Sequence, residues 1–250
     1  MIRLVFLIRR QEHLSLDEFQ SYWLNEHAPL VAEHGRELNI LRYTQSHRID
    51  QGEQKPGPRG VMEVPYDGVA ELWFANEAAF RAGSTDAGKA LLADERTFID
   101  LPNSPIWLAY EYPQVNPIPE NLVARPKSGI VKLHFPLRHP DTMSLDDAQL
   151  YWRTQHGPLI RSWAPAMGML RYQQVHRFES PLEAGLRKVR GTVTPSYTGH
   201  AEAWFDRSIT RSGAEAAAAS RAAYEDETNF IDFARSAIWT GKEHVIIDQW

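Results

Sequence analysis

The sequence predicts an α+β protein that contains two copies of one βαββαβ unit. The main observation is an internal repeat: residues 15–48 align without a gap with residues 144–177, and 15 of the 34 positions are identical. Strand-like and helix-like segments follow one another in the same order in both copies, and four prolines between residues 113 and 126 separate the copies. A repeat of this length indicates a duplicated domain, because solenoid repeats are only about 20–50 residues long.

The domain boundaries follow from the repeat. We expect a first repeat at residues 1–113, a proline-rich linker at 114–127 and a second repeat at 128–250. The apolar share of 43% and the charged share of 24% are ordinary for a soluble globular protein. The net charge is −5 and the basic residues are scattered, so we expect no nucleic-acid partner. The absence of cysteine excludes disulfides, thiol nucleophiles and thiolate metal ligands.

The first ten residues do not have the pattern of a targeting segment. Their apolar run is too short to span a membrane, and their charges follow the apolar stretch, whereas a signal peptide has them before it. We therefore expect a cytoplasmic protein with no membrane partner. The sequence leaves open whether the fused chain forms a homodimer.

Each copy begins with a strand-like segment, at residues 3–9 and 130–137. A serine with an acidic residue three positions later then marks the start of a helix, in the pattern of a capping box; the two pairs are Ser15 with Glu18 and Ser144 with Asp147. We expect Pro29 and Pro158 to end these helices, because proline disfavours the α conformation of the residue before it.

The remaining segments complete the unit. Alternating patterns predict second strands at residues 40–49 and 169–178 and third strands at 69–74 and 200–205, with a long turn-rich segment between them. A second helix follows at about 77–92, and its counterpart contains the alanine-rich run 214–223, because alanine favours helix. Last strands contain Trp107 and Trp239. The order is the ferredoxin-like arrangement.

One such unit has helices on only one face of its sheet. Leaving the other face in water costs about 25 cal/mol per Å² of apolar surface. The second copy is the obvious cover, so we predict that the two sheets meet face to face and enclose an apolar pocket with approximate two-fold symmetry.

Five motifs occur once in each copy. They are Ser-x-Asp-Glu/Asp, Tyr-Trp, His-x-Pro-Leu, Arg-Tyr and Glu-x-Trp-Phe, and a further match pairs Asp94-Glu95-x-x-Phe98 with Asp226-Glu227-x-x-Phe230. With the five motifs the chain resembles the EthD family of the dimeric α+β barrel superfamily. The resemblance implies that the chain is a fused pair that makes its barrel internally. It also implies cofactor-independent decarboxylase, dehydratase, cyclase or isomerase activity on aromatic or polyketide compounds; some distant relatives are monooxygenases or haem binders.

Candidate site residues include one histidine in the last turn of the first helix of each copy. It lies on the helix face that points towards the core. His27 and His156 could act there as general acids or as substrate-binding groups at the rim of a pocket, since a helix C-terminus favours an imidazolium. The alternative is a structural histidine that caps the helix or bonds a loop carbonyl.

The second strand of each copy has polar residues on both of its faces. Tyr43, Gln45 and His47, with Tyr172, Gln174 and His176, point to one side and could hydrogen-bond a phenol or a developing oxyanion, or pack beneath the first helix. Arg42 and Arg171 lie on the opposite side and could bind a carboxylate through a planar fork, or form exposed salt bridges. The sequence does not decide which side faces the pocket.

Glu71 and Glu202 stand in the middle of apolar strands and share a face with Trp73 and Trp204. A carboxylate against tryptophan is costly to ionise, so we expect a raised pKa and a role as acid or base. The alternative is a buried partner for an arginine. We interpret the tryptophans as core or cavity wall.

The copies differ at two positions: His134 and His200 replace Val5 and Val69. We therefore place the polar reaction centre in the second half, where these histidines would join Glu202 and Tyr172. Chance histidines at strand ends are the competing interpretation.

Neither a His-Glu-x-x-His motif nor a glycine-rich phosphate motif occurs, so we expect no metal and no cofactor. The leading hypothesis is a cofactor-independent lyase, a decarboxylase or dehydratase, acting on a small oxygenated aromatic or polyketide-like substrate. The alternatives are an isomerase, a cyclase or a cofactor-independent monooxygenase. A non-catalytic protein that binds a small apolar molecule is a third hypothesis.

Overall fold

A computed structural model describes residues 1–50, 57–116, 122–209 and 213–249. Strands and helices alternate in the first repeat in the predicted order. Its elements are β1 (Ile2–Ile8), α1 (Leu16–Tyr22), η1 (Trp23–His27), α2 (Ala28–His34), β2 (Arg42–Arg48), β3 (Gly68–Phe74), α3 (Glu77–Arg81), α4 (Thr85–Phe98), η2 (Leu101–Asn103) and β4 (Ile106–Val115).

The second repeat has the same strand order, with α7 between its second and third strands and the single helix α8 where the first repeat has α3 and α4. Its elements are β5 (Ile130–Leu137), α5 (Leu145–Tyr151), η3 (Trp152–His156), α6 (Gly157–Met167), β6 (Met169–Arg177), α7 (Pro181–Arg190), β7 (Gly199–Asp206), α8 (Ala214–Glu227), η4 (Phe233–Arg235) and β8 (Trp239–Asp248). Among the described residues, no helix is both long enough and apolar enough to cross a membrane.

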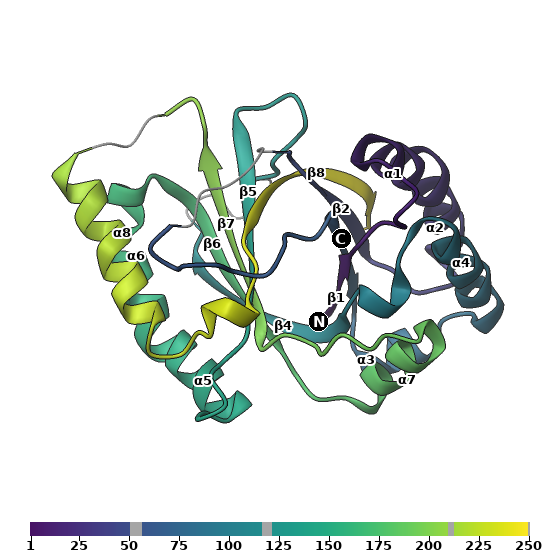
Figure 1. Cartoon of the computed structure of the whole chain (residues 1–250). Coiled ribbons are helices and arrows are strands. Elements are labelled where there is room, and N and C mark those ends of the chain that lie inside the picture. The colour runs from purple at the N-terminus through teal and green to yellow at the C-terminus, as the bar shows by residue number, and fades with distance from the viewer. Residues whose placement is uncertain (51–56, 117–121, 210–212, 250) are drawn as a thin grey trace.

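The eight strands form one closed antiparallel barrel in the order β1-β3-β2-β8-β5-β7-β6-β4. Figure 1 shows it along its axis, with α1, α2 and α4 on one side and α5, α6 and α8 on the other. The two repeats join where β2 pairs with β8 and where β4 pairs with β6. The predicted union of the two copies is confirmed in the form of a single barrel. The interior that was expected to be an apolar pocket is instead occupied by an apolar side-chain cluster and by buried ion pairs.

The boundary between the repeats differs from the prediction. β4 continues to Val115 and pairs there with Tyr172, so residues 114 and 115 belong to a strand and not to a linker. The antiparallel partner on β6 extends the strand beyond the first proline, Pro113. Residues 117–121 of the predicted linker lie outside the described residues.

The first helix of each repeat does not end at its proline. A π-helical turn follows it, in which the N–H of Ala28 donates to the carbonyl of Trp23. Pro29 then lies in the first turn of α2, where its missing N–H costs nothing. The side-chain amide of Gln45 donates to the same Trp23 carbonyl at 2.8 Å, and the second repeat has the equivalent contact from Gln174 to Trp152. π turns are rare and are frequent at functional sites.

Two other helix predictions need correction. The helix expected at residues 77–92 is divided into α3 and α4, because Ser84 starts a new helix by accepting a hydrogen bond from the N–H of Ala87. α7 lies in the segment predicted to be turn-rich, and it packs beside α3 of the first repeat (Figure 1). The alanine-rich helix is confirmed as α8.

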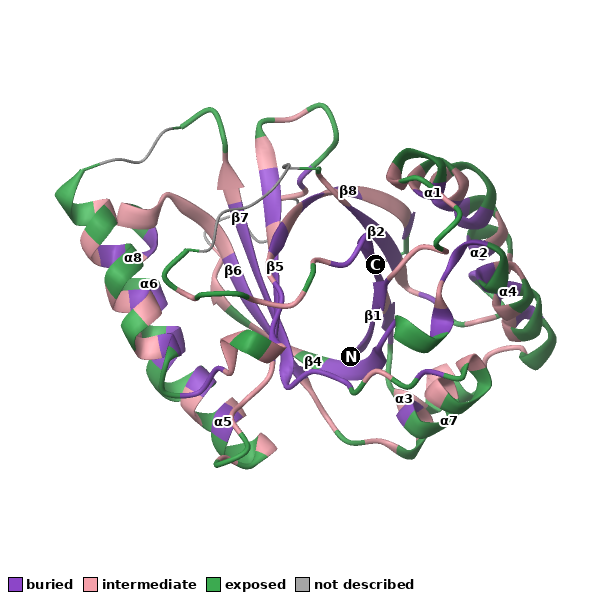
Figure 2. Cartoon of the chain, in the orientation of Figure 1, coloured by how far each residue is buried: buried purple, intermediate pink, exposed green. Residues whose placement is uncertain are grey.

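Most barrel strands are buried on both faces, whereas β8 and the second half of β4 are partly exposed and the helices expose their outer sides (Figure 2). One apolar cluster fills part of the interior and contains Val5, Val69, Trp107 and Trp239. Two larger clusters lie outside the barrel, between the sheet and the helices of each repeat. Gly68 on β3 makes room for the outer cluster, because a Cβ there would clash with the Trp23 ring and approach the carbonyl oxygen of Ser46 to 2.8 Å.

Candidate functional site

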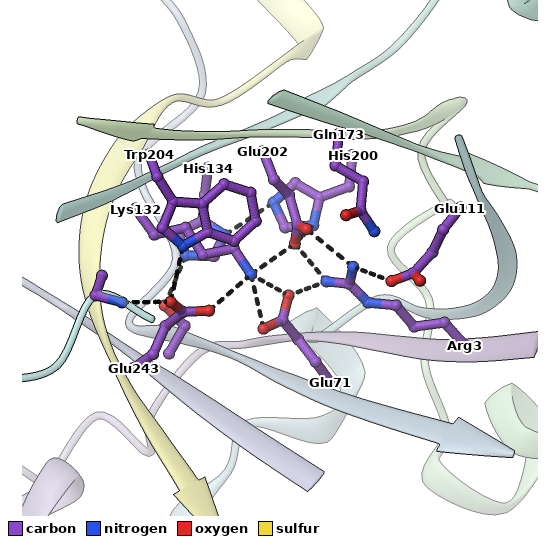
Figure 3. A network of polar contacts seen from close by, with 12 residues as sticks. Arg3, Glu71, Glu111, Lys132, His134, Gln173, His200, Glu202, Trp204 and Glu243 are labelled. Atoms are coloured by element: carbon purple, nitrogen blue, oxygen red, sulfur yellow. Dashed lines mark hydrogen bonds and ion pairs between the residues drawn. The ribbon is translucent and has the colours of Figure 1, made fainter. Parts of the chain in front are cut away.

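Polar groups gather in two places, and the first is the barrel interior. Six charged side chains from six strands form the interior ion cluster, which consists of Arg3, Glu71, Glu111, Lys132, Glu202 and Glu243 (Figure 3). The Lys132 ammonium lies 2.6 Å from Glu71 and 2.9 Å from Glu202. The Arg3 guanidinium bonds both of these carboxylates and lies 2.9 Å from Glu111. Each of the two central carboxylates thus contacts two cations.

This pairing corrects the expected pKa of Glu202. Burial alone would raise the pKa of this carboxyl group, but the adjacent Arg3 and Lys132 lower it well below its usual range. The carboxylate is ionised and paired, which is the alternative interpretation that the sequence left open. Arg3 is the arginine concerned.

His134 and His200 lie beside the cluster, on the predicted face. Nε2 of His134 is 2.6 Å from the Ser46 hydroxyl, and its Nδ1 is 3.0 Å from Nε2 of His200. Burial lowers the pKa of His200 to about 3 and that of His134 well below its ordinary value. Both rings are therefore neutral at pH 7.

The four residues Glu71, His134, His200 and Glu202 could each offer one ligand atom to a metal ion, and these atoms lie within 4.8 Å of one another. However, Lys132 and Arg3 already occupy both carboxylates. A metal ion would have to displace these two buried cations, so the donor set fits an ion-pair cluster better than a metal centre.

The tryptophans and arginines predicted to bind substrate belong to this same barrel-facing side. Trp73 and Trp204 donate their indole N–H groups to Glu111 and Glu243, each at 2.9 Å. The guanidinium groups of Arg42 and Arg171 lie 5.5 Å and 4.7 Å from the centres of the Trp73 and Trp204 rings, respectively.

The predicted joint site of Glu202, His200 and Tyr172 does not form. In the register of β6 and β7, Gln173 lies opposite Glu202 and Tyr172 lies opposite Ala203. Because side chains alternate along a strand, Tyr172 points out of the barrel, away from the two others. The sequence left open which face of the second strand points into the barrel. In the structure the tyrosines lie beneath the helices, and the arginines point towards the barrel interior.

The second place consists of two equivalent cavities between the sheet and the helices. Cavity 1, in the first repeat, has a volume of about 410 Å³, and cavity 2, in the second, about 370 Å³. Both are lined mainly by apolar side chains. The residues that recur in both linings include Trp23, His27, Tyr43 and Glu95 in cavity 1, and their equivalents Trp152, His156, Tyr172 and Glu227 in cavity 2.

Each cavity histidine is held by an aspartate. Nδ1 of His27 lies 2.6 Å from Asp94, and Nδ1 of His156 lies 2.7 Å from Asp226. This contact assigns the proton to Nδ1, and Nε2 has no hydrogen-bond partner among the described residues. Burial would raise the pKa of Asp226, but hydrogen bonds from His156 and Tyr151 lower it below its ordinary value. The aspartate is therefore a carboxylate that orients the ring.

The hydroxyl group of the cavity tyrosine has a hydrogen to donate. The Tyr43 oxygen accepts hydrogen bonds from Trp23 at 3.1 Å and from Gln45 at 2.9 Å. Its own hydrogen has no acceptor among the residues that the structure describes. Burial raises the pKa of Tyr43, so the group stays protonated. The arrangement around Tyr172 is the same, with the His156 ring centre 6.4 Å away and nearly perpendicular to the tyrosine ring.

His47 and His176 have a different environment from the other predicted histidines. They stack on Trp23 and Trp152 at 4.7 Å and 4.5 Å, and they do not line the cavities. Burial lowers the pKa of each to about 3. These two rings pack behind the cavity wall. The alternative interpretation of this strand placed the histidine near a solvated end, which is wrong because both rings are buried.

Sequence reasoning missed the arginine that each cavity receives from the other repeat. Arg190, on α7, lines cavity 1 and donates to Glu95 at 2.7 Å. Arg59 lines cavity 2 and donates to Glu227 at 2.6 Å and 2.8 Å. We call these cross-repeat pair 1 and cross-repeat pair 2. The two arginines occupy equivalent positions, because Arg59-Gly60 aligns with Arg190-Gly191 at the same shift of 131 residues that pairs Glu71 with Glu202. The comparison of the repeats did not extend to this segment, so this signal was missed.

Comparisons with known proteins agree with the duplicated fold. The family model described as EthD domain matches residues 11–102 and 140–234. No curated protein matches the chain. Among solved structures, an anthrone oxidase-like protein is 10% identical with a TM-score of 0.59, covering 100% of this chain and 94% of that one. A provisionally named monooxygenase from Lactobacillus acidophilus NCFM is 11% identical with a TM-score of 0.49, covering 99% and 96%.

Proposed function

The chain belongs to the EthD domain family, and we propose that it is a cofactor-independent enzyme that transfers protons on a small oxygenated aromatic or polyketide-like substrate. The observation that carries this proposal is the duplicated histidine–aspartate pair beside a tyrosine hydroxyl, set in an apolar cavity. Apolar surroundings with a few converging polar groups are typical of small-molecule sites.

The geometry supports defined roles for three residues of cavity 1. The free Nε2 of His27 takes a proton from a substrate hydroxyl or an acidic C–H group. Asp94 stabilises the imidazolium that forms, and negative charge develops on a substrate oxygen. The Tyr43 hydroxyl donates a hydrogen bond to that oxygen. The imidazolium then returns its proton to a carbon or to a leaving group. His156, Asp226 and Tyr172 offer the same three functions in cavity 2.

We assign this proton transfer to a lyase reaction, a decarboxylation or a dehydration. In a decarboxylation the imidazolium protonates the ring carbon, the bond to the carboxylate breaks, and carbon dioxide leaves. Both electrons of that bond return to the ring system. No external oxidant or reductant is required, in keeping with the groups that line the cavity.

An oxygenation is the second candidate. The same deprotonation produces an electron-rich carbanion or phenolate that can react with dioxygen without a cofactor. The fold shared with an anthrone oxidase-like protein favours this candidate, although 10% identity carries only the fold.

The test is turnover of a panel of hydroxylated aromatic acids, with carbon dioxide and oxygen measured together. Carbon dioxide release without oxygen uptake supports the lyase, and oxygen uptake without carbon dioxide release supports the oxygenase. Replacing both histidines, His27→Gln with His156→Gln, should lower turnover by roughly 10²- to 10⁴-fold. His13→Gln, at an exposed histidine, is the matched control.

Two outcomes would contradict the proposal. Full turnover in the double variant would remove the histidines from the site. Tight binding of the panel compounds without any turnover would identify a binding protein, the third hypothesis from the sequence.

A further inference from the structure

The two cavities differ in the state of their cross-repeat pairs. In pair 2, the carboxylate oxygens of Glu227 both accept hydrogen bonds from Arg59, through Nε and Nη2. In pair 1, Arg190 donates only through Nη2 and only to Oε1 of Glu95. Pair 2 is thus a bidentate ion pair with two hydrogen bonds, and pair 1 has a single hydrogen bond.

Pair 1 therefore retains two unused polar atoms. Nε of Arg190 and Oε2 of Glu95 are both buried, and neither has a hydrogen-bond partner among the described residues. Glu95 is 6% exposed and lies on the wall of cavity 1, as does Arg190. A buried polar atom without a partner loses its hydration and gains nothing in return, so a ligand that supplies partners for both atoms would be favoured.

The chemistry of the two atoms defines that ligand. Nε–H of the guanidinium is a donor and needs an acceptor, whereas Oε2 of the carboxylate is an acceptor and needs a donor. The remaining wall is mainly apolar, with aromatic side chains such as Phe6, Phe74 and Phe80. A fitting molecule carries a carbonyl or carboxylate oxygen beside a hydroxyl group on an apolar ring.

We propose that cavity 1 is the substrate cavity, and that Arg190 and Glu95 select aromatic compounds with a hydroxyl group adjacent to a carboxylate or carbonyl group. The ligand oxygen accepts from Arg190, and the ligand hydroxyl donates to Glu95. Cavity 2 does not recognise this pair of groups, because Arg59 and both carboxylate oxygens of Glu227 satisfy each other. This inference rests on the proposed function for its substrate class and adds the group that is recognised.

Equilibrium binding to the full chain tests the inference. The three probes are 1-hydroxy-2-naphthoate, which has both groups, and 2-naphthoate and 1-naphthol, which have one each. We expect the first to bind at least tenfold more tightly than either of the others, with one site per chain. Equal affinity of all three probes, or two equal sites, would overturn the inference.

Variants locate the site. Glu95→Gln and Arg190→Lys should each weaken binding of 1-hydroxy-2-naphthoate at least tenfold. Glu227→Gln and Arg59→Lys, the matched changes in cavity 2, should leave the affinity within twofold. An equal loss from both sets of variants would overturn the assignment to cavity 1. Arg190→Lys keeps the positive charge, so it remains informative if Glu95→Gln does not fold.

The same measurements separate this inference from the proposed function. If binding follows the expected pattern but no compound of the panel is turned over, the proposed function fails and the binding site stands. If turnover occurs and kcat/KM is unaffected by Glu95→Gln and Arg190→Lys, the inference fails and the proposed function stands.

Discussion

The two faces of the barrel sheet carry similar residue types in opposite states. On the inner face, carboxylates, cations and imidazoles meet one another, and burial fixes their charges. On the outer face, a histidine nitrogen, a tyrosine hydrogen and two atoms of cross-repeat pair 1 have no partner among the described residues. The inner carboxylates are each paired with cations, although Nε of Arg3 and Nδ1 of His200 have no hydrogen-bond partner among the described residues. The outer histidine and tyrosine instead line a cavity that can hold a ligand.

This difference assigns different tasks to the two faces. A buried ion cluster in which each carboxylate contacts a cation favours one pairing of the strands, because another register would leave a charge unpaired. A group available for proton transfer must be reachable and must not be committed to another side chain. Glu202, at first sight the sharpest catalytic candidate, belongs to the first category.

The largest effect should come from breaking the interior cluster. Glu202→Gln removes a charge that contacts both Arg3 and Lys132, and it should lower the free energy of unfolding by about 3–5 kcal/mol, because buried cations lose their counter-ion. Chemical denaturation measures this change. Glu215→Gln, at an exposed glutamate, should leave stability unchanged. A Glu202→Gln variant of normal stability that has lost turnover would reverse the assignment of the two faces.

A smaller effect should follow from filling the space behind a cavity wall. Gly68→Ala or Gly199→Ala places a methyl group against the Trp23 or Trp152 ring and should cost about 1–3 kcal/mol of stability. Gly185→Ala, in α7 with open space around it, should instead stabilise by about 0.4–1 kcal/mol. Denaturation midpoints of the three variants test this. Equal effects at all three glycines would show that the tryptophans are not tightly packed.

The third effect concerns pH and disappears at neutral pH. His47 and His176 have pKa values of about 3 in the folded protein, whereas an unfolded histidine titrates near 6.5. Between these values the unfolded chain binds more protons, so stability falls as the pH falls from about 6.5 towards 3. Within that window, His47→Gln should reduce the slope of unfolding free energy against pH by about 1.4 kcal/mol per pH unit. His13→Gln should not change the slope, and an unchanged slope in His47→Gln would place that ring in contact with water.

Much of the fold could be predicted from the sequence. The repeat, the capping serines and the strand alternation gave the element order, and burial of the free sheet face predicted the union of the two copies. The π turns could not be foreseen, because they depend on Gln45 and Gln174 reaching across from the neighbouring strand. α7 was missed because the whole segment between the second and third strands was interpreted as turn-rich; it has 21 residues in the second repeat and 19 in the first.

The candidate site was less predictable than the fold. The alternation of side chains along a strand shows which residues share a face of the sheet, but not which face points into the barrel. Tyr172 and Glu202 were expected on the same face, and the structure places them on opposite faces. A usable signal was present in the repeated Asp94-Glu95 and Asp226-Glu227 motif. These residues hold His27 and His156 and receive the arginines from the opposite repeat.

The exchange of arginines between the repeats also bears on how such a chain can diversify. Neither repeat encodes a complete cavity, since each one depends on a segment that its twin provides. A change in one of these segments therefore alters the cavity of the other half. Because Arg59 and Arg190 occupy equivalent positions in the two repeats, a recombinant with two copies of one repeat would still provide an arginine for the glutamate of each cavity.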